Sequence, residues 1–258
     1  MDNLFIKNEE FVMRDDEFEK DGEFYCSNCK TNRTVSFDNF GKVRCLCECQ
    51  AKERDLKEEE ERKLEIRRRY LDKLEKIGIN YKKYGFKKFK IESDYQKAMY
   101  EAGMKFYEEP ELGLVITGKT GAGKTHILSS AVINLIMSGK QVEYLKWLQH
   151  GRELKAVVNN ELEYKNKIFK YRTAKILYID DFLKVGRNSD VTSADMTLAF
   201  DILDYRTQHK LPTIISSERS IKEIAEIDEA VAGRLLELCS LRVELKNYCN
   251  VKNYRLNF

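Results

Sequence analysis

Residues Gly118 to Thr125 read GKTGAGKT and match the phosphate-binding pattern G-x-x-x-x-G-K-[S/T]. Glycines let a backbone curl so that successive N–H groups point at phosphate oxygens, and the lysine of the pattern reaches the β- and γ-phosphates. The hydroxyl that follows ligates Mg²⁺. An apolar run precedes the loop and an apolar-periodic helix follows it, which is the context such a loop requires. The residues predicted to bind the nucleotide here are Gly118, Lys119, Thr120, Gly121, Ala122, Gly123, Lys124 and Thr125.

A second apolar run, ILYIDD from Ile176 to Asp181, ends in two acids. We expect Asp180 to hold through water the Mg²⁺ that Thr125 ligates, and Asp181 to orient or deprotonate the attacking water. Two acids can also simply end a strand at the surface, but the phosphate loop upstream favours the catalytic interpretation.

Five of the seven cysteines lie in YCSNC and RCLCEC, between Cys26 and Cys49. A C-x-x-C turn holds two thiolates on one side of a metal, and a second cluster can complete a tetrahedron. We expect four of five thiols to bind zinc and favour Cys26, Cys29, Cys45 and Cys47, with Cys49 as the alternative. An iron–sulfur cluster would use the same donors, but the paired spacing favours zinc.

The 258 residues are 42% hydrophobic and 34% charged, and the net charge is only +3. A nucleic-acid surface would therefore have to be local. The N-terminus lacks an apolar segment after a basic start, and no stretch approaches a membrane span. The composition predicts a cytoplasmic protein that does not contact membranes.

The chain divides into three predicted parts: a cysteine-rich module with short strands such as TVSF over 1–50, a charged helical linker over 51–80, and a core over 81–258. In the core, strands and helices alternate, which predicts an α/β fold with a parallel sheet. The expected strands are 112–117, 141–147, 175–180, 212–217 and 241–245, and the main expected helices are 95–109, 125–138, 193–210 and 221–239.

GAGKTH, the IDD strand end, LPTIISS, the GR of AVAGRLLELC and the terminal NYR together resemble the AAA+ helicase loaders of the DnaC/DnaI type, from phages or Gram-positive bacteria. This resemblance covers about residue 81 to the end and implies an AAA+ ATPase core without a substantial lid domain. It adds His126 and Ser217 to the expected nucleotide contacts. It also makes Arg234 an arginine finger that reaches a neighbour's site, although a surface ion pair is the alternative.

Two departures from the wider superfamily concern acids. Glu218 stands near the position where a polar sensor, often Asn, is usual, and Asp181 replaces the usual Glu. A shorter carboxylate at Asp181 would suit slow hydrolysis. Arg255 is a candidate to replace in part the arginine that the lid domain usually supplies. The alternative is that Arg255 is only a surface charge near the C-terminus.

The resemblance implies that the protein loads a hexameric replicative helicase onto single-stranded DNA, with the zinc module gripping the helicase and the core binding ATP, DNA and further copies of itself. The lysine- and aromatic-rich segment Tyr81 to Lys90 suits nucleic acid, but we favour packing of Phe86 and Phe89 near the adenine or the core. The alternatives are a transposase-helper ATPase and a zinc-dependent DNA-binding regulator.

Overall fold

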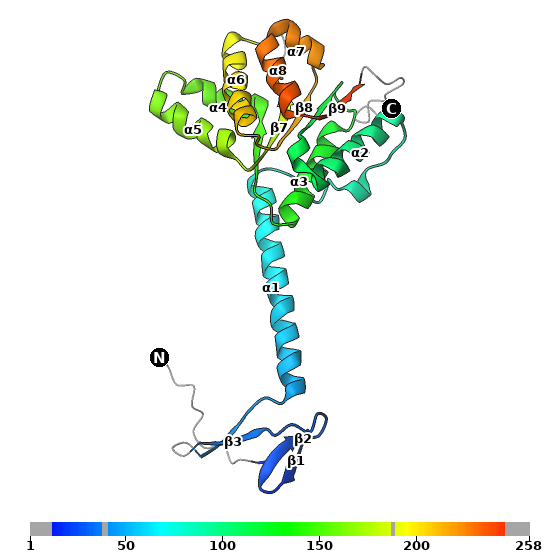
Figure 1. The fold of residues 1–258 in the computed structure, drawn as a ribbon, viewed down its shortest axis with the longest axis vertical. Helices are drawn as coiled ribbons and strands as arrows, with labels where there is room; N and C mark the ends of the chain where they lie inside the picture. The colour runs from blue at the N-terminus through cyan, green and yellow to red at the C-terminus, as the bar shows by residue number, and fades with distance from the viewer. Residues whose placement is uncertain (1–11, 38–40, 187–188, 246–258) are drawn as a thin grey trace. The chain divides into compact units, whose positions relative to one another are not determined.

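The computed structural model describes residues 12–37, 41–186 and 189–245, and its contacts divide the chain into two compact units, Met1–Arg68 and Arg69–Phe258 (Figure 1). Helix α1 (Glu48–Lys76) begins in the first unit and ends in the second. Within the described ranges, no helix is both long enough and apolar enough to cross a membrane.

Two short β-hairpins and the beginning of α1 make up the described part of the first unit. β1 (Glu17–Lys20) pairs antiparallel with β2 (Glu23–Cys26), and β3 (Thr34–Phe37) pairs antiparallel with β4 (Gly41–Arg44). The strand TVSF that we predicted from the sequence is β3.

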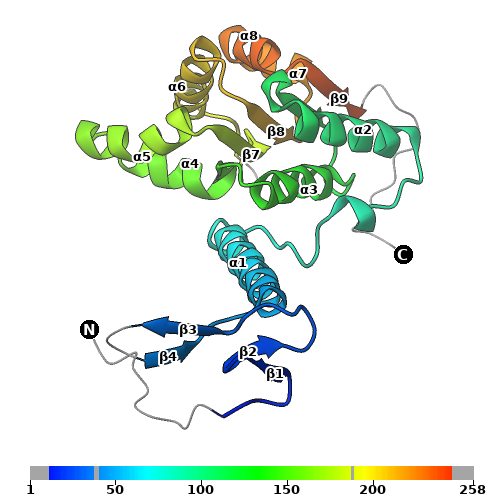
Figure 2. The same cartoon turned by 60° about the horizontal axis from the view of Figure 1, so that its bottom comes forward.

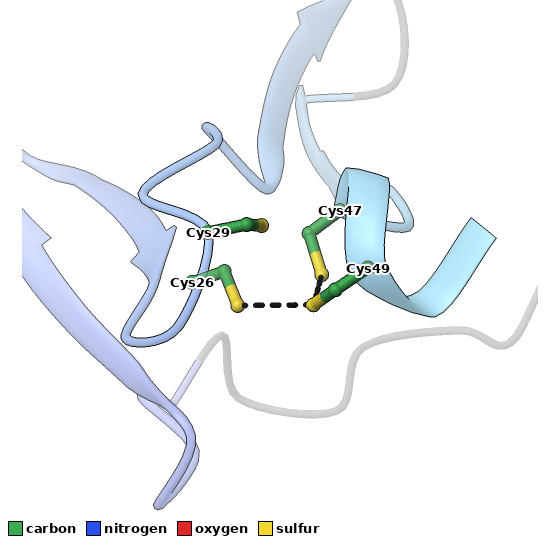
Figure 3. Close-up of side chains that lie close together, drawn as sticks. All are labelled: Cys26, Cys29, Cys47 and Cys49. Atoms are coloured by element: carbon green, nitrogen blue, oxygen red, sulfur yellow. Dashed lines mark hydrogen bonds between the residues drawn. The ribbon is translucent and has the colours of Figure 1, made fainter. Parts of the chain in front are cut away.

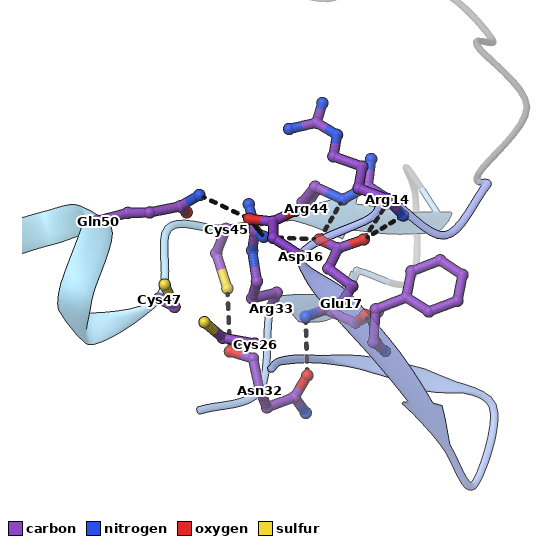
Figure 4. Close-up of polar contacts among 12 residues, drawn as sticks. Arg14, Asp16, Glu17, Cys26, Asn32, Arg33, Arg44, Cys45, Cys47 and Gln50 are labelled. Atoms are coloured by element: carbon purple, nitrogen blue, oxygen red, sulfur yellow. Dashed lines mark hydrogen bonds and ion pairs between the residues drawn. The ribbon is translucent and has the colours of Figure 1, made fainter. Parts of the chain in front are cut away.

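A network of charged side chains lies in the first unit, and two of its members, Arg33 and Glu17, are buried (Figure 4). The Arg33 guanidinium is 2% exposed and lies 2.8 Å from Asp16 and 3.1 Å from the buried carboxylate of Glu17, which also accepts from Arg44 at 2.9 Å. Among the described residues of this unit, the buried hydrophobic side chains are Phe24, Cys26 and Cys47. An apolar core of this size needs a covalent or metal staple to hold a fold.

The second unit is built on a five-stranded parallel sheet with strand order β6-β7-β8-β5-β9. The predicted α/β class is therefore confirmed. The strands are β5 (Leu114–Thr117), β6 (Val142–Lys146), β7 (Ile176–Phe182), β8 (Thr213–Ser217) and β9 (Leu241–Glu244).

Helices cover both faces of this sheet (Figure 2). Along β5, Leu114 and Ile116 belong to the hydrophobic cluster that contains α2 and α3, whereas Val115 belongs to the cluster under α4 to α8. This alternation is the period of a strand buried on both faces. The helices are α2 (Asp94–Glu108), α3 (Lys124–Met137), α4 (Trp147–Ala156), α5 (Glu161–Thr173), α6 (Ser193–Gln208), α7 (Ile221–Ile227) and α8 (Glu229–Leu238), with short 3₁₀ turns at Phe86–Lys88 and Pro110–Leu112.

One predicted element differs from the structure. The single helix expected over 221–239 is two helices, because Asp228 is extended (φ −156°) and its side chain accepts from the backbone N–H groups of Ala230 and Val231. An aspartate in this position caps the start of a new helix. The break turns α8 away from the line of α7 and sets the direction of the residues that follow.

Arg206 on α6 is a fully buried cation that joins three segments of the second unit. Its guanidinium donates to the carbonyl oxygens of Tyr171, Ala174 and Pro212 at 3.0, 2.8 and 2.6 Å, and to the hydroxyl of Thr213 at 2.8 Å. These acceptors lie at the end of α5 and around the start of β8. Because β7 begins just after the end of α5, Arg206 holds the starts of two neighbouring strands, β7 and β8, in place.

Candidate nucleotide and metal sites

The phosphate loop lies between the end of β5 and the start of α3. Gly123 caps α3 with a left-handed φ of 98°, and a Cβ atom there would lie 3.0 Å from the ring of Phe89. Lys124 is 5% exposed, and its Nζ donates to the carbonyl oxygens of Gly118 and Lys119 at 2.5 and 3.0 Å. Its charge is thus held within the curve of the loop, where burial lowers the pKa of Lys124 and the nearby Glu218 and Asp181 oppose that shift. A buried cation held within a glycine-rich loop at the start of a helix is suited to polyphosphate.

Asp180 receives hydrogen bonds from several elements. The Thr125 hydroxyl lies 3.3 Å from its Oδ1, the hydroxyls of Tyr178 and Ser216 donate to the same oxygen at 2.9 and 2.6 Å, and Tyr144 donates to Oδ2 at 2.9 Å. Burial is the largest cause of the raised pKa of Tyr144 and Tyr178, so both remain donors. Asp180 and Thr125, the two residues predicted to bind Mg²⁺, therefore lie in contact and offer the hard oxygen ligands that this ion prefers.

Asp181 follows at the end of β7 and has a different environment. Its backbone φ is 54°, its N–H donates to the Ser216 hydroxyl at 2.8 Å, and its carboxylate accepts from Lys184 at 3.0 Å. The hydroxyl of Ser216 thus joins the two acids, because it donates to Asp180 and accepts from Asp181. Ser216 was not predicted from the sequence.

Ser217 and Glu218, both expected near the nucleotide, contact the phosphate loop in different ways. The Ser217 hydroxyl is fully buried and donates to the carbonyl of Phe182 at 2.9 Å, and its own carbonyl accepts from Gly118 at 3.0 Å. The structure therefore brings Ser217 to the loop through its backbone only. The next side chain, Glu218, accepts a hydrogen bond from the loop residue Thr120 and forms an ion pair with Lys184 at 2.8 Å.

His126 lies in the first turn of α3 against the aromatic segment that precedes α2. Its Nε2 is 3.2 Å from the carbonyl oxygen of Gly85, and its ring packs edge-on against Tyr84 and Phe89 at centroid distances of 5.4 and 5.2 Å. Phe86 is buried and packs against Tyr100. This segment therefore covers the start of the helix that follows the phosphate loop, and burial lowers the pKa of His126.

Arg234 on α8 makes two ion pairs within its own chain. Its guanidinium lies 2.8 Å from Asp204 and 3.0 Å from Glu237, and its side chain is 36% exposed. The ion pair that we gave as the alternative is thus present, and half-exposure leaves the guanidinium reachable from outside. Arg255 lies outside the described residues.

In the first unit, the sulfur atoms of Cys26, Cys29, Cys47 and Cys49 all lie within 4.8 Å of one another (Figure 3). Cys49 Sγ is 3.6 Å from that of Cys26 and 3.1 Å from that of Cys47. Four thiolates around a zinc ion at about 2.3 Å would lie about 3.8 Å apart, so this donor set fits a tetrahedral site. The Thr31 hydroxyl and backbone N–H groups lower the pKa of Cys29 to about 5, which favours the thiolate that a metal needs.

The fourth sulfur comes from Cys49 and not from Cys45, which our preferred set included. Cys45 continues the β3–β4 pairing, since its N–H donates to the carbonyl of Arg33 at 2.8 Å, and its Sγ is 3.6 Å from the carbonyl oxygen of Asn32. The chain then turns into α1, whose first residues carry Cys47 and Cys49 to the sulfurs of the C-x-x-C turn. The C-x-C pair that joins the cluster is therefore Cys47 and Cys49, and not Cys45 and Cys47.

Residues 80–239 match the family described as the bacterial DnaA ATPase domain. Two similar curated proteins come from Bacillus subtilis strain 168. The uncharacterized protein YqaM is 31% identical over 156 residues, which are 57% of this chain and 49% of YqaM, so this chain spans about half its length. Protein XkdC of the phage-like element PBSX is 27% identical over 259 residues, which are 95% of this chain and 91% of XkdC.

Three solved structures share the fold of the second unit. DnaI superposes with a TM-score of 0.52 at 20% identity, covering 67% of this chain and 90% of its own. The DnaC helicase loader gives 0.50 at 19% identity, covering 62% and 95%. The initiator DnaA bound to AMPPCP and single-stranded DNA gives 0.54 at 19% identity, covering 65% and 50%. At these identities the likeness shows the fold alone, and the second unit has the α/β core fold that the motifs indicated.

Proposed function

The chain belongs to the family of bacterial DnaA ATPase domains, and we propose that it uses ATP to load a replicative DNA helicase onto single-stranded DNA. Membership makes it a replication-initiation ATPase of the AAA+ type, and the fold that it shares with DnaI and the DnaC helicase loader supports the narrower role. The observation that carries the ATPase part is the contact of Thr125 with Asp180 beside the buried Lys124.

In this proposal each group of the site has one task. Lys124 and the loop N–H groups would bind the β- and γ-phosphates, and Thr125 and Asp180 are the residues that would hold Mg²⁺. Asp181 orients the attacking water, since it directly follows Asp180 near the carboxyl end of β7. The ion supplies charge neutralisation at the phosphates when it is bound. The hydrogen bonds from Tyr144 and Ser216 fix the Asp180 carboxylate before the nucleotide arrives.

The cysteine cluster is the second functional site. Bound by Cys26, Cys29, Cys47 and Cys49, a zinc ion would staple the first unit, whose described apolar core is small. The unit carries exposed hydrophobic side chains on β3 and β4, Val35, Phe37 and Val43, which support a role in protein contact. We assign helicase binding to this unit, and single-stranded DNA and neighbouring copies of the chain to the core.

Two alternatives make different predictions. A zinc-dependent DNA-binding regulator would use the phosphate loop only as a structural nucleotide site, so single-stranded DNA would not stimulate hydrolysis. A transposase-helper ATPase would hydrolyse ATP but bind a transposase in place of a hexameric helicase. The test is the rate of ATP hydrolysis by the full chain with and without single-stranded DNA and helicase. Stimulation by both supports the loader, and no stimulation by either contradicts it.

A further inference from the structure

Lys184 forms a bridge between two acids at the edge of the phosphate loop. Its Nζ lies 3.0 Å from Asp181 Oδ2 and 2.8 Å from Glu218 Oε1, and Glu218 also accepts a hydrogen bond from the loop residue Thr120. All three ion-pair side chains are partly buried, with exposures of 28% for Lys184 and Asp181 and 34% for Glu218. The bridge therefore links the end of β7, the end of β8 and the phosphate loop.

The backbone places Lys184 in this position by an unusual turn. Asp181 and Leu183 both have positive φ angles, 54° and 58°, and the N–H of Lys184 donates to the carbonyl of Asp181 at 3.0 Å. Left-handed conformations at residues other than glycine carry a cost and persist where surrounding contacts impose them. Here Leu183 is fully buried, and the bonds that Ser216 and Ser217 of β8 make to residues 181 and 182 hold the turn.

The charges around the loop explain why such a turn is useful. Lys124 is engaged by the carbonyl oxygens inside the loop, and Asp180 faces Thr125 where Mg²⁺ would bind. Asp181 and Glu218 are two further negative charges on the side of the loop where Thr120 lies. Without a cation between them they would repel each other and any additional phosphate. The donors Lys184 and Thr120 hold the pKa of Glu218 below its usual range, although burial opposes this.

We propose that Lys184 is a positioning residue that neutralises Asp181 and Glu218, so that the site accepts the terminal phosphate of ATP while Asp181 stays in place to orient water. The inference rests on the proposed ATPase function and adds to it a cation in the same chain that sets the preference for ATP over ADP. Its effect is through charge, so removal of one acid should compensate for removal of Lys184.

The experiment measures binding of Mg²⁺-ADP and of a non-hydrolysable Mg²⁺-ATP analogue to the full chain by calorimetry. We expect Lys184→Met to weaken binding of the ATP analogue about fivefold while ADP affinity stays within about twofold, a difference typical of one partly exposed ion pair. Lys184→Arg should restore most of the loss. The double variant Lys184→Met/Glu218→Gln should regain the affinity for the ATP analogue, because one carboxylate has been removed with the cation.

Two further variants keep the test decisive. Glu218→Gln alone leaves Lys184 with a single acid and should bind the ATP analogue more tightly than wild type, so the idea stays testable if Lys184→Met folds poorly. Lys167→Met is the matched control, because Lys167 pairs with Glu163 at 2.8 Å on α5 and should change neither affinity.

An unchanged ratio of ATP-analogue to ADP affinity in Lys184→Met would overturn the proposal, and so would failure of Glu218→Gln to compensate. Faster hydrolysis by Lys184→Met would also overturn it, because Lys184 would then restrain Asp181. Lys124→Ala separates this inference from the function on which it rests. If Lys124→Ala binds both nucleotides as wild type does, the assigned ATP site is wrong, whatever Lys184 does.

Discussion

The hydroxyl of Thr125, in the first turn of α3, lies 3.3 Å from the carboxylate of Asp180, at the end of β7. The two residues are 55 positions apart along the chain, and one lies on a helix whereas the other lies on a strand of the parallel sheet. In such sheets, ligands bind beyond the carboxyl ends of the strands, and this contact marks that edge. Asp181, the next residue, can then act on a water beside the metal.

Asp181→Asn is expected to keep nucleotide binding and to lose hydrolysis by roughly two orders of magnitude or more, because the amide cannot accept a proton from water. Two quantities are measured for each protein: the rate of ATP hydrolysis and the affinity for a non-hydrolysable ATP analogue. Asp190→Asn, in the loop after β7, is a control for loss of a negative charge nearby. Hydrolysis by Asp181→Asn at the wild-type rate would mean that another group orients the water.

Arg234→Ala is expected to leave nucleotide affinity nearly unchanged and to lower ATPase activity at high protein concentration, if the guanidinium leaves Asp204 for a neighbour's site. The sharper measurement mixes Arg234→Ala with Lys124→Ala protein, since each variant can supply what the other lacks. Partial recovery of activity supports action between subunits. No recovery, under conditions where mixed assemblies demonstrably form, would leave Arg234 as a structural ion pair.

The full chain is expected to contain one zinc ion, held by the four clustered cysteines. Cys49→Ser should lose the metal and unfold the first unit, because the tetrahedral site loses one of its thiolates. Cys45→Ser is the matched control and should retain the metal, since Cys45 lies outside the cluster and contacts Asn32. Metal analysis and circular dichroism of the two variants decide between them, and metal loss in Cys45→Ser alone would reverse the assignment.

Arg206→Met is expected to destabilise the second unit by about 3 kcal/mol, because it removes the guanidinium donor from the buried carbonyl oxygens of Tyr171 and Ala174. Denaturant unfolding measures the change. Arg206→Lys keeps the charge but lacks the planar set of N–H donors, so it should lose a large share of the same stability. Full stability in Arg206→Lys would show that the charge, and not the hydrogen bonds to the end of α5 and the start of β8, is what stabilises this site.

Much of the fold and part of the site could be predicted from the sequence, because their signals are local. The phosphate loop is continuous in sequence, and the apolar runs that end in IDD and ISS identify buried strands. The ionic contacts of Glu218 and Lys184 carry no such signal. They depend on left-handed conformations at Asp181 and Leu183, which residues other than glycine seldom adopt.

Strand neighbours were also beyond sequence reasoning. Tyr144 reaches Asp180 because β6 lies next to β7 and pairs Tyr144 with Tyr178, and strand order is a property of the whole sheet. The choice of Cys49 over Cys45 has a similar origin, because it depends on where the hairpin pairing stops and α1 starts. The break between α7 and α8 differs from this pattern, because Asp228 before a new apolar period is a local signal for the start of a helix.

The proposed function gives the two units different tasks, and capture of a hexameric replicative helicase by the full chain without nucleotide tests this assignment. Three variants are compared with wild type: Cys26→Ser, Lys124→Ala and Cys45→Ser. We expect Cys26→Ser to lose helicase binding and to keep ATP binding. Lys124→Ala should lose ATP binding and keep helicase binding. Cys45→Ser should keep both. If Cys26→Ser has lost its zinc and still binds the helicase fully, the first unit is not the helicase-binding unit, and the contact lies on the ATPase core.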